Sequence, residues 1–256
     1  MELRVLGAHN LESRSTRFES HLIDGVIALD AGSLTRALTF KEQARVRAVL
    51  LSHRHFDHVR DLLPLGLALH NAGGAVDVYG IRDTIEFVSA KLLDGSLYPD
   101  LVRIPSVQSP AVRLHTIDYC CEFAVLEYRV KAVPVPHTVP ATGYQISSGE
   151  TSVFYTGDAG RGLAGVWRHI SPGALLTEVT YGDGNLSQAI EHGHMTPSLL
   201  KEALQALRAE KGQLPRVIVS HMNPPWEDDI RRELAALQLE LGVSIVVSQA
   251  GMTISL

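Results

Sequence analysis

The chain has 256 residues, of which 45% are hydrophobic and 20% are charged, and 23 basic against 28 acidic side chains give a formal net charge of −5. This length and apolar content suffice for a buried core, so a disordered or fibrous protein is excluded. The acidic balance lacks the basic excess of proteins that hold long nucleic acids, so we expect no stable complex with nucleic acid.

The two cysteines, Cys120 and Cys121, are neighbours in the chain and cannot build a disulfide framework. Polar residues interrupt the N-terminal sequence, and no apolar run reaches the roughly 20 residues that span a membrane. We therefore expect a cytoplasmic protein with no signal peptide and no membrane partner. A homodimer is the default expectation for its oligomeric state.

Apolar periodicity and turn residues predict the elements of the first half of the chain. In chain order they are strand 3–6, strands 21–23 and 26–30 around an Asp24-Gly25 hairpin turn, helix 34–41, strand 47–52, helix 61–71, strand 75–79 and helix 84–93. An Asp-Gly pair between two apolar runs is a strong signal for such a turn.

The second half begins with a β-rich stretch and ends with two well-marked helices. Its predicted elements are strands 112–117, 122–133, 143–147, 152–155 and 174–179, a flexible Gly- and Asn-rich loop (YGDGN), a helix from Pro197, strand 217–220, helix 227–241 and strand 244–248. Thr196 supplies a capping oxygen before Pro197, and Gly242 ends the last helix.

This order of elements predicts an α/β protein with two mixed β-sheets packed face to face and helices on the outside. No Pro- or Ser-rich linker, charge run or internal repeat divides the chain. We therefore predict one domain over residues 1–256.

Histidine and aspartate gather in the run HRHFDH at 53–58, directly after the predicted strand 47–52. Alternate residues of an extended segment share a side, so His53 and His55 can hold one cation. Asp57 and His58 lie just beyond and can reach a second cation. Imidazole and carboxylate suit Zn²⁺ and similar divalent metals, whereas a mere cluster of surface histidines would not be expected to follow a buried strand.

The H-x-H-x-D-H run after a strand resembles the metallo-β-lactamase superfamily of binuclear metallohydrolases, and the resemblance implies their four-layer αββα fold. It also implies three further ligands at later strand ends, which are His137 in VPVPHTVP, Asp158 in VFYTGDAG and His221 in VIVSHMNP. By this resemblance two divalent ions are bound, Zn²⁺ first and Mn²⁺ or Fe²⁺ as alternatives. The first lies between His53, His55 and His137, the second lies between Asp57, His58 and His221, and Asp158 bridges them.

His194 in GHMTP resembles the Gly-His-x-Thr segment of ribonuclease Z and of class II cyclic nucleotide phosphodiesterases, where the histidine faces the scissile phosphate. Glu178 in LLTEVT resembles the acidic residue that orients it, and Asp57 completes the implied catalytic set. A carboxylate behind an imidazole raises the basicity of the ring. The alternative interpretation of His194 is a structural one, as a loop or helix-capping histidine without a catalytic role. Tyr181 and Asn185, in the loop before it, are candidate substrate contacts.

Two further segments favour the cyclic nucleotide branch. LLDGSLYPDL at 92–101 and HMNPPWEDDIRRELAAL at 221–237 resemble segments of class II phosphodiesterases, and the long basic, Gly-rich arm of ribonuclease Z has no counterpart here. The chain departs from the class II signature at two positions. It has Phe56 where Leu is usual, and Asp61 where a small residue is usual.

The resemblance implies an enzyme that hydrolyses 3′,5′-cyclic nucleotides, cAMP or cGMP, to 5′-nucleotides. A hydroxide held between the two metal ions would attack phosphorus, and His194 would protonate the leaving oxygen as general acid. A ribonuclease Z-like endonuclease acting on tRNA 3′ ends, or another hydrolase of small phosphodiesters, is the first alternative. A lactone or thioester hydrolase is more distant. From a different class, the protein could be a metal-binding scaffold or sensor without turnover.

Overall fold

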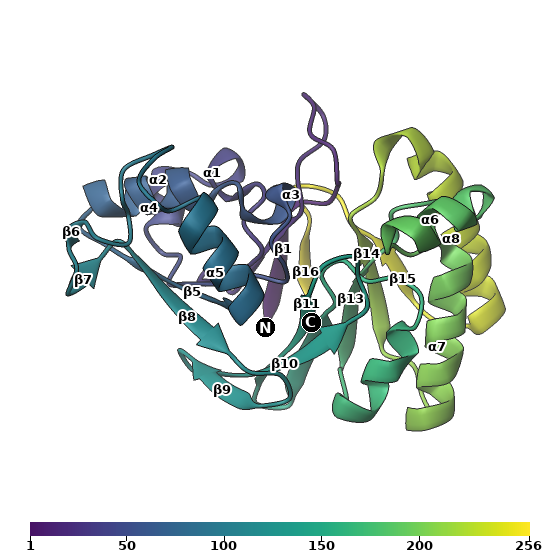
Figure 1. The fold of residues 1–256 in the computed structure, drawn as a ribbon. Coiled ribbons are helices and arrows are strands. Elements are labelled where there is room, and N and C mark those ends of the chain that lie inside the picture. Colours follow the sequence, from purple (N-terminus) through teal and green to yellow (C-terminus); the bar gives the residue numbers. More distant parts are fainter.

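Two seven-stranded β-sheets face each other in the computed structural model, which describes residues 1–256 (Figure 1). The first sheet has the strand order β16-β1-β2-β3-β4-β5-β8, and the second has the order β15-β14-β13-β12-β11-β10-β9. A small two-stranded sheet of β6 and β7 lies apart from them.

The strands have the following bounds: β1 (Glu2–Gly7), β2 (Ser20–Ile23), β3 (Ile27–Leu29), β4 (Ala48–Leu50), β5 (Val76–Ile81), β6 (Pro105–Ser106), β7 (Ser109–Pro110), β8 (Val112–Ile117), β9 (Glu122–Val125), β10 (Tyr128–Val135), β11 (Ala141–Ser148), β12 (Thr151–Tyr155), β13 (Ala174–Glu178), β14 (Arg216–Ser220), β15 (Ile245–Val247) and β16 (Thr253–Ser255). The α-helices are α1 (Leu34–Ala37), α2 (Phe40–Gln43), α3 (Phe56–Val59), α4 (Leu62–Asn71), α5 (Arg82–Lys91), α6 (Leu186–His192), α7 (Pro197–Lys211) and α8 (Glu227–Leu241). Three 3-10 helices are η1 (Leu163–His169), η2 (Asp183–Asn185) and η3 (Pro224–Trp226).

Three hydrophobic clusters fill the spaces between four layers. The inter-sheet cluster joins side chains of both sheets, such as Leu50 and Tyr144. A second cluster packs α4 and α5 on the outer face of the first sheet, and a third packs η1, α7 and α8 on the outer face of the second. Figure 1 shows these two groups of helices on opposite sides of the sheets. The predicted αββα arrangement is confirmed.

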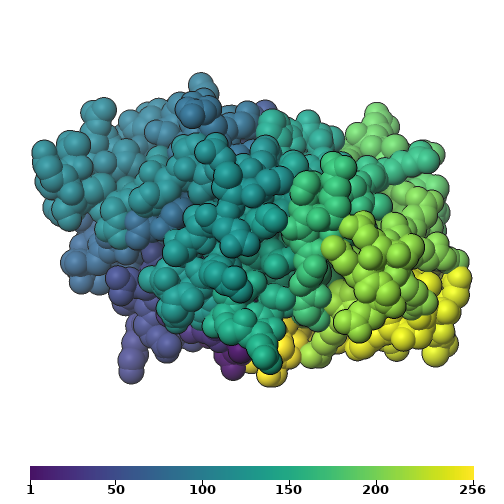
Figure 2. Space-filling view, turned by 90° about the horizontal axis from the view of Figure 1, so that it is seen from below, coloured from purple at the N-terminus to yellow at the C-terminus, as the bar shows by residue number.

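The middle of the chain connects the two sheets. After β8, an edge strand of the first sheet, the chain turns into β9, an edge strand of the second sheet. In Figure 2 this teal segment fills the centre of the lower face, between the blue first half and the yellow-green second half of the chain. This connection between the sheets is short, since β8 ends at Ile117 and β9 begins at Glu122.

The parallel strands place the predicted metal ligands at one edge of the two sheets. Strands β3, β4, β5 and β8 are mutually parallel in the first sheet, and β12, β13, β14 and β15 are parallel in the second. Because the carboxyl ends of parallel strands meet at the same edge, the loops that follow them come together there. The predicted metal ligands follow β4, β10, β12 and β14.

Several local predictions are confirmed by the backbone. Asp24 and Gly25 both have positive φ, as the predicted hairpin turn requires. The Thr196 hydroxyl accepts a hydrogen bond from the backbone N–H of Leu199, and Pro197 occupies the first turn of α7. No helix of the structure combines the length and apolar character needed to cross a membrane.

Three local predictions are wrong. The predicted helix 34–41 is divided into α1 and α2, because Thr39 and Glu42 form a capping box that starts a new helix. The predicted strand 122–133 is a hairpin of β9 and β10, in which Leu126 has a positive φ. The Gly- and Asn-rich segment, predicted as a loop, contains the 3-10 helix η2 and leads into α6, a helix that was not predicted.

The Tyr144 hydroxyl, fully buried on β11, donates a hydrogen bond of 2.7 Å to the carbonyl of Leu51 after β4, and so joins the two sheets. Tyr144→Phe leaves that buried carbonyl without its donor, so we expect a loss of about 1–3 kcal/mol in the free energy of unfolding, measured by urea denaturation. Tyr98→Phe is the control, because the Tyr98 hydroxyl forms no side-chain hydrogen bond. Equal stability of both variants would contradict the inter-sheet role.

Candidate metal centre

The predicted ligands converge at the carboxyl edge of the two sheets. His53, His55, His137 and Asp158 present ligand atoms within 4.8 Å of one another, and so do Asp57, His58 and His221. A third overlapping group joins Asp158 and His221 to the predicted catalytic pair, Glu178 and His194. The structure therefore brings together every predicted metal ligand and both members of that pair.

Asp158 stands between the two groups of ligands. Its Oδ2 atom lies 3.6 Å from His53 Nε2 and 3.8 Å from His137 Nε2. Its Oδ1 atom lies 3.2 Å from His58 Nε2, and it accepts no hydrogen bond although it is buried. A buried carboxylate oxygen without a donor is costly, and a cation would satisfy it. The residues present therefore fit a pair of divalent metal ions.

The imidazole nitrogens of each group point at one another. His55 Nδ1 lies 2.9 Å from His53 Nε2 and 3.3 Å from His137 Nε2. Burial lowers the pKa of all three rings, and it does so strongly for His53, which favours the neutral form that binds metals. Such close nitrogen lone pairs repel unless a proton or a cation lies between them.

The ligand atoms of the second group also converge, but burial, which lowers the pKa of His58 and His221, is outweighed by the Asp158 carboxylate, so that the pKa of both rings is raised. His221 Nε2 lies 3.3 Å from His58 Nε2 and 3.2 Å from Asp57 Oδ2. Two imidazoles and a carboxylate that converge from α3 and from the end of β14 form a ligand set suited to Zn²⁺ and its neighbours.

The second nitrogen of each buried ring is held by a group behind it. His58 Nδ1 donates to Asp30 Oδ2 at 2.7 Å, and His137 Nδ1 donates to the Gly193 carbonyl at 2.8 Å. His221 Nδ1 lies 2.9 Å from the Thr180 hydroxyl. These bonds fix the tautomer that turns Nε2 and its lone pair toward the cluster.

Asp30 is the centre of the network behind the first sheet. Asp30 is fully buried. Its carboxylate accepts hydrogen bonds of 2.6–2.7 Å from the Ser52 N–H and hydroxyl, the His58 ring and the Tyr155 hydroxyl. The Ser52 hydroxyl in turn lies 2.9 Å from His53 Nδ1. One carboxylate therefore orients ligands of both groups, His53 through Ser52 and His58 directly.

Backbone strain and close approach also mark this edge. Asp30 and His221 both have φ of 56°, which is uncommon for residues other than glycine and persists only where the surroundings impose it. Gly157, just before Asp158, has φ of 58°, and a Cβ there would lie 2.4 Å from Ser52 Cβ. Only glycine allows the β12 loop to approach the Ser52 backbone so closely.

Glu178 holds His194 against the cluster. Glu178 is 2% exposed, and its Oε1 atom accepts from His194 Nδ1 at 2.7 Å and from the Ala159 N–H at 3.0 Å. Its Oε2 atom accepts from the Thr180 hydroxyl and from two backbone N–H groups. Burial lowers the pKa of His194, but the adjacent Glu178 carboxylate outweighs it and raises the pKa above its ordinary value.

Helix capping does not account for His194, because Thr196 is the cap of α7. The His194 ring is 14% exposed, and its Nδ1 atom lies 3.9 Å from Asp158 Oδ2. Its Nδ1–H is engaged by Glu178, which leaves the other ring nitrogen available to a ligand. The arrangement can deliver a proton beside the metal ligands.

The two predicted substrate contacts, Tyr181 and Asn185, differ in their distance from the ligand cluster. The Tyr181 ring lies 5.9 Å from the His194 ring, and its hydroxyl pairs with His192 Nδ1 at 2.7 Å. The Asn185 amide donates to the Gln188 side chain on α6, 2.9 Å away, and is not part of the cluster of ligand atoms.

Sequence reasoning missed the residues that orient the ligands. Asp30, Ser52 and Thr180 carry no motif of their own. The available signal was their position, because each lies at or just after the carboxyl end of a predicted strand at this edge.

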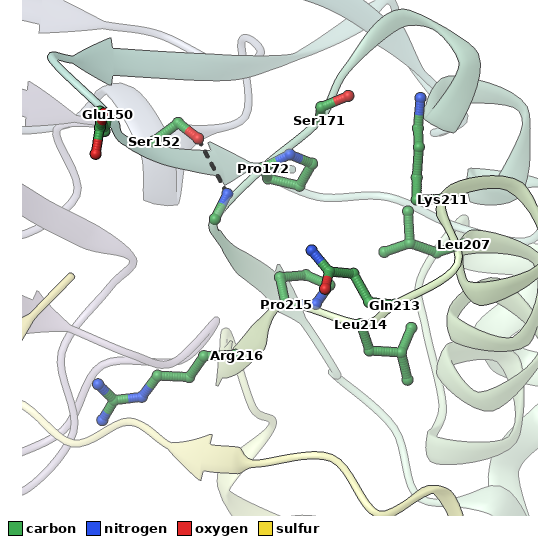
Figure 3. Close-up of a pocket in the computed structure, with 11 residues that line it drawn as sticks. Glu150, Ser152, Ser171, Pro172, Leu207, Lys211, Gln213, Leu214, Pro215 and Arg216 are labelled. Atoms are coloured by element: carbon green, nitrogen blue, oxygen red, sulfur yellow. Dashed lines mark hydrogen bonds between the residues drawn. The ribbon is translucent and has the colours of Figure 1, made fainter.

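A pocket of about 510 Å³ lies elsewhere, where β12, β13 and β14 begin (Figure 3). Ser152, Gly173 and Arg216 line it, and the Gly173 N–H donates to the Ser152 hydroxyl at 3.0 Å. It contains none of the predicted site residues, because strand beginnings and strand ends lie at opposite edges of a parallel sheet.

Comparisons with known proteins agree with this fold. A family model described as a β-lactamase superfamily domain matches residues 21–222. No curated protein sequence matches the chain. Unliganded yeast PDE1 has a TM-score of 0.82 at 16% identity, over 100% of this chain and 99% of that one.

Two other solved structures are similar over nearly their whole length. The metallo-β-lactamase fold protein YhfI from Bacillus subtilis has a TM-score of 0.77 at 15% identity, over 99% of this chain and 98% of that one. The short form of human tRNase Z (ELAC1) has a TM-score of 0.71 at 19% identity, over 100% of this chain and 99% of that one. At these identities the shared property is the fold.

Asp30→Asn removes the charge behind His58 while keeping the side-chain shape. We expect metal affinity, measured by competition with a chromophoric chelator, to fall about 10- to 100-fold, because groups behind a ligand orient it and raise its basicity. Asp77→Asn is the matched control, since Asp77 on β5 pairs with Arg113 and lies outside the cluster. Unchanged affinity in Asp30→Asn would show that His58 is oriented without this carboxylate.

Proposed function

Because the chain belongs to the β-lactamase superfamily, we propose that its metal centre hydrolyses phosphodiester bonds and that 3′,5′-cyclic nucleotides are its substrates. The observation that carries the proposal is the Glu178–His194 pair at the edge of the ligand cluster, with 2.7 Å between Oε1 and Nδ1. Cleavage of a phosphodiester expels an alkoxide, which must be protonated to leave, and a carboxylate-backed imidazole is suited to donate that proton.

The ligand sets support two divalent ions. His53, His55 and His137 would hold the first ion, Asp57, His58 and His221 would hold the second, and Asp158, which lies between the two groups, would be shared by both. The nitrogen-rich set favours Zn²⁺, with Mn²⁺ or Fe²⁺ as alternatives. When bound, two such ions neutralise charge on phosphoryl oxygens and lower the pKa of a water molecule.

The protein's own groups complete the chemistry. His194 carries a proton at the rim of the cluster, and Glu178 keeps that ring in one orientation through Nδ1. Asp57 is 21% exposed at the side chain, so its carboxylate can also accept a proton from a water molecule that approaches from solvent. Glu178 itself cannot act on substrate, because it is buried and its oxygens are saturated with donors.

The choice of a small nucleotide over RNA rests on two observations. Yeast PDE1 has a TM-score of 0.82 with this chain, against 0.71 for human tRNase Z, and the net charge of −5 opposes a long polyanion. The similarity to human tRNase Z makes a tRNA-processing endonuclease the second candidate. A metal-binding scaffold without turnover is the candidate of a different class. Tyr181, near His194, remains a proposed substrate contact, and Asn185 a more distant one.

Product analysis of metal-loaded protein with 3′,5′-cyclic AMP, 2′,3′-cyclic AMP and a tRNA precursor tests these candidates side by side. We expect conversion of 3′,5′-cyclic AMP to 5′-AMP. His194→Asn should retain its metal content and lose about 10²- to 10⁴-fold in kcat, because the proton donor is gone.

His115→Asn is the control for His194→Asn, since His115 also pairs with a carboxylate at 2.7 Å but on the first sheet. Cleavage of the precursor alone would move the protein to the endonuclease candidate. Bound metal without hydrolysis of any diester would favour the scaffold.

Glu178→Gln should narrow the pH range of activity. His194 acts as an acid only while protonated, so activity falls as pH rises through its pKa. The Glu178 charge raises that pKa, so its removal lowers it. We expect the alkaline limb of the kcat profile to move to lower pH, with metal content unchanged. An unmoved limb would mean that another group supplies the proton.

A further inference from the structure

Solvent reaches the ligand cluster along one short segment. The side chains of His53, His58 and His137 have no exposed surface, and Asp158 and His221 are 2% exposed. In contrast, His55 and Asp57 are partly exposed. A substrate that reaches the ligand atoms therefore passes these two residues or His194, whose side chain is 14% exposed.

Phe56 is the apolar side chain of that segment. It is the first residue of α3, lies between His55 and Asp57, and is 60% exposed. Its ring meets the edge of Phe18 with centroids 6.3 Å apart and planes at 82°. In Figure 1, the purple loop between β1 and β2 rises beside α3.

Phe18, which contacts Phe56, is itself held in place by Arg60. The Arg60 guanidinium lies 4.9 Å from the centre of the Phe18 ring and pairs with Glu12 and Asp61. Phe56 is thus an aromatic ring held on one side by Phe18, exposed over most of its surface, in the chain between two residues of the ligand cluster.

A second aromatic pair, Tyr181 and Trp226, lies near His194, but its rings are less accessible than Phe56. Trp226 stacks on Tyr181 with centroids 4.7 Å apart and planes at 29°, and it packs against the core of the second sheet. One face of each ring is therefore already covered. Phe56 offers an aromatic surface that no stacked ring covers.

On the basis of the proposed function, we propose that Phe56 is a specificity-determining residue that stacks on the nucleobase of the substrate. A phosphate held among the ligands places the nucleoside at the rim where Phe56 lies. Every base has a π-face, so stacking on a phenyl ring selects nucleotides over simple diesters without selecting one base. Exposed phenylalanine alone means little, and the position between two cluster residues distinguishes Phe56 from Phe40 on α2, which is 81% exposed.

The test compares two chromogenic diesters that share the p-nitrophenolate leaving group, thymidine 5′-(p-nitrophenyl) phosphate and methyl p-nitrophenyl phosphate. Phe56→Ala should raise KM for the thymidine ester about tenfold or more, with kcat and the methyl ester nearly unchanged. Phe56→Trp should restore the KM, and Phe40→Ala should change neither ester. Metal content and Tm are compared in all variants.

Three results would overturn the proposal. Equal losses on both esters would place the effect of Phe56 in the metal centre, and an unchanged thymidine ester would place the base elsewhere. If Trp226→Ala rather than Phe56→Ala abolishes the preference for the thymidine ester, the base lies on the facing side and Phe56 is not its platform.

Failure of the proposed function has its own signature, since the metal-loaded parent would then hydrolyse neither ester and no 3′,5′-cyclic AMP. Stacking is then measured as binding of adenosine 5′-monophosphate by titration calorimetry. An affinity about tenfold weaker in Phe56→Ala supports the stacking role. Equal affinity, or no binding by the parent, overturns it.

Discussion

The buried carboxylate of Asp158 is the constraint on which the rest of the site depends. Burial raises its pKa, but the surrounding histidines, His221 and His58 foremost, more than offset this and hold the pKa well below its ordinary value. An ionised carboxylate with an oxygen that accepts no hydrogen bond is tolerable only where positive charge can reach it. This requirement explains why the rings of both ligand groups turn toward the same carboxylate.

The site also depends on both sheets at once. His58 follows the first sheet and is held by Asp30, while His221 follows the second sheet and is held by Thr180, and their Nε2 atoms meet at 3.3 Å. A shift of one sheet against the other would separate the two ligands. The inter-sheet core and the Tyr144 hydrogen bond to Leu51 therefore serve the metal centre as well as the fold.

The carboxylates Glu178 and Asp57 have different surroundings, which suit them to different roles. Glu178 is saturated by five hydrogen bonds, so it acts through His194 and Thr180, whereas Asp57 is partly exposed. The segment 55–57 is the exposed part of the cluster. It contains the predicted metal ligands His55 and Asp57, and between them the exposed side chain of Phe56. In the proposed function, recognition by Phe56 and chemistry at Asp57 would be built on adjacent residues of the short helix α3.

The sequence by itself determined the four-layer fold and the residues that converge, because HRHFDH is local and His137, Asp158 and His221 each follow a recognisable strand. It also determined the cap of α7, since Thr196 and Pro197 act on their own neighbours. Only the tertiary structure decided that Asp30 lies behind His58, that Thr180 links Glu178 to His221, and that Asn185 turns to Gln188. These contacts join residues whose partners depend on packing between loops, and no period or short motif encodes that packing.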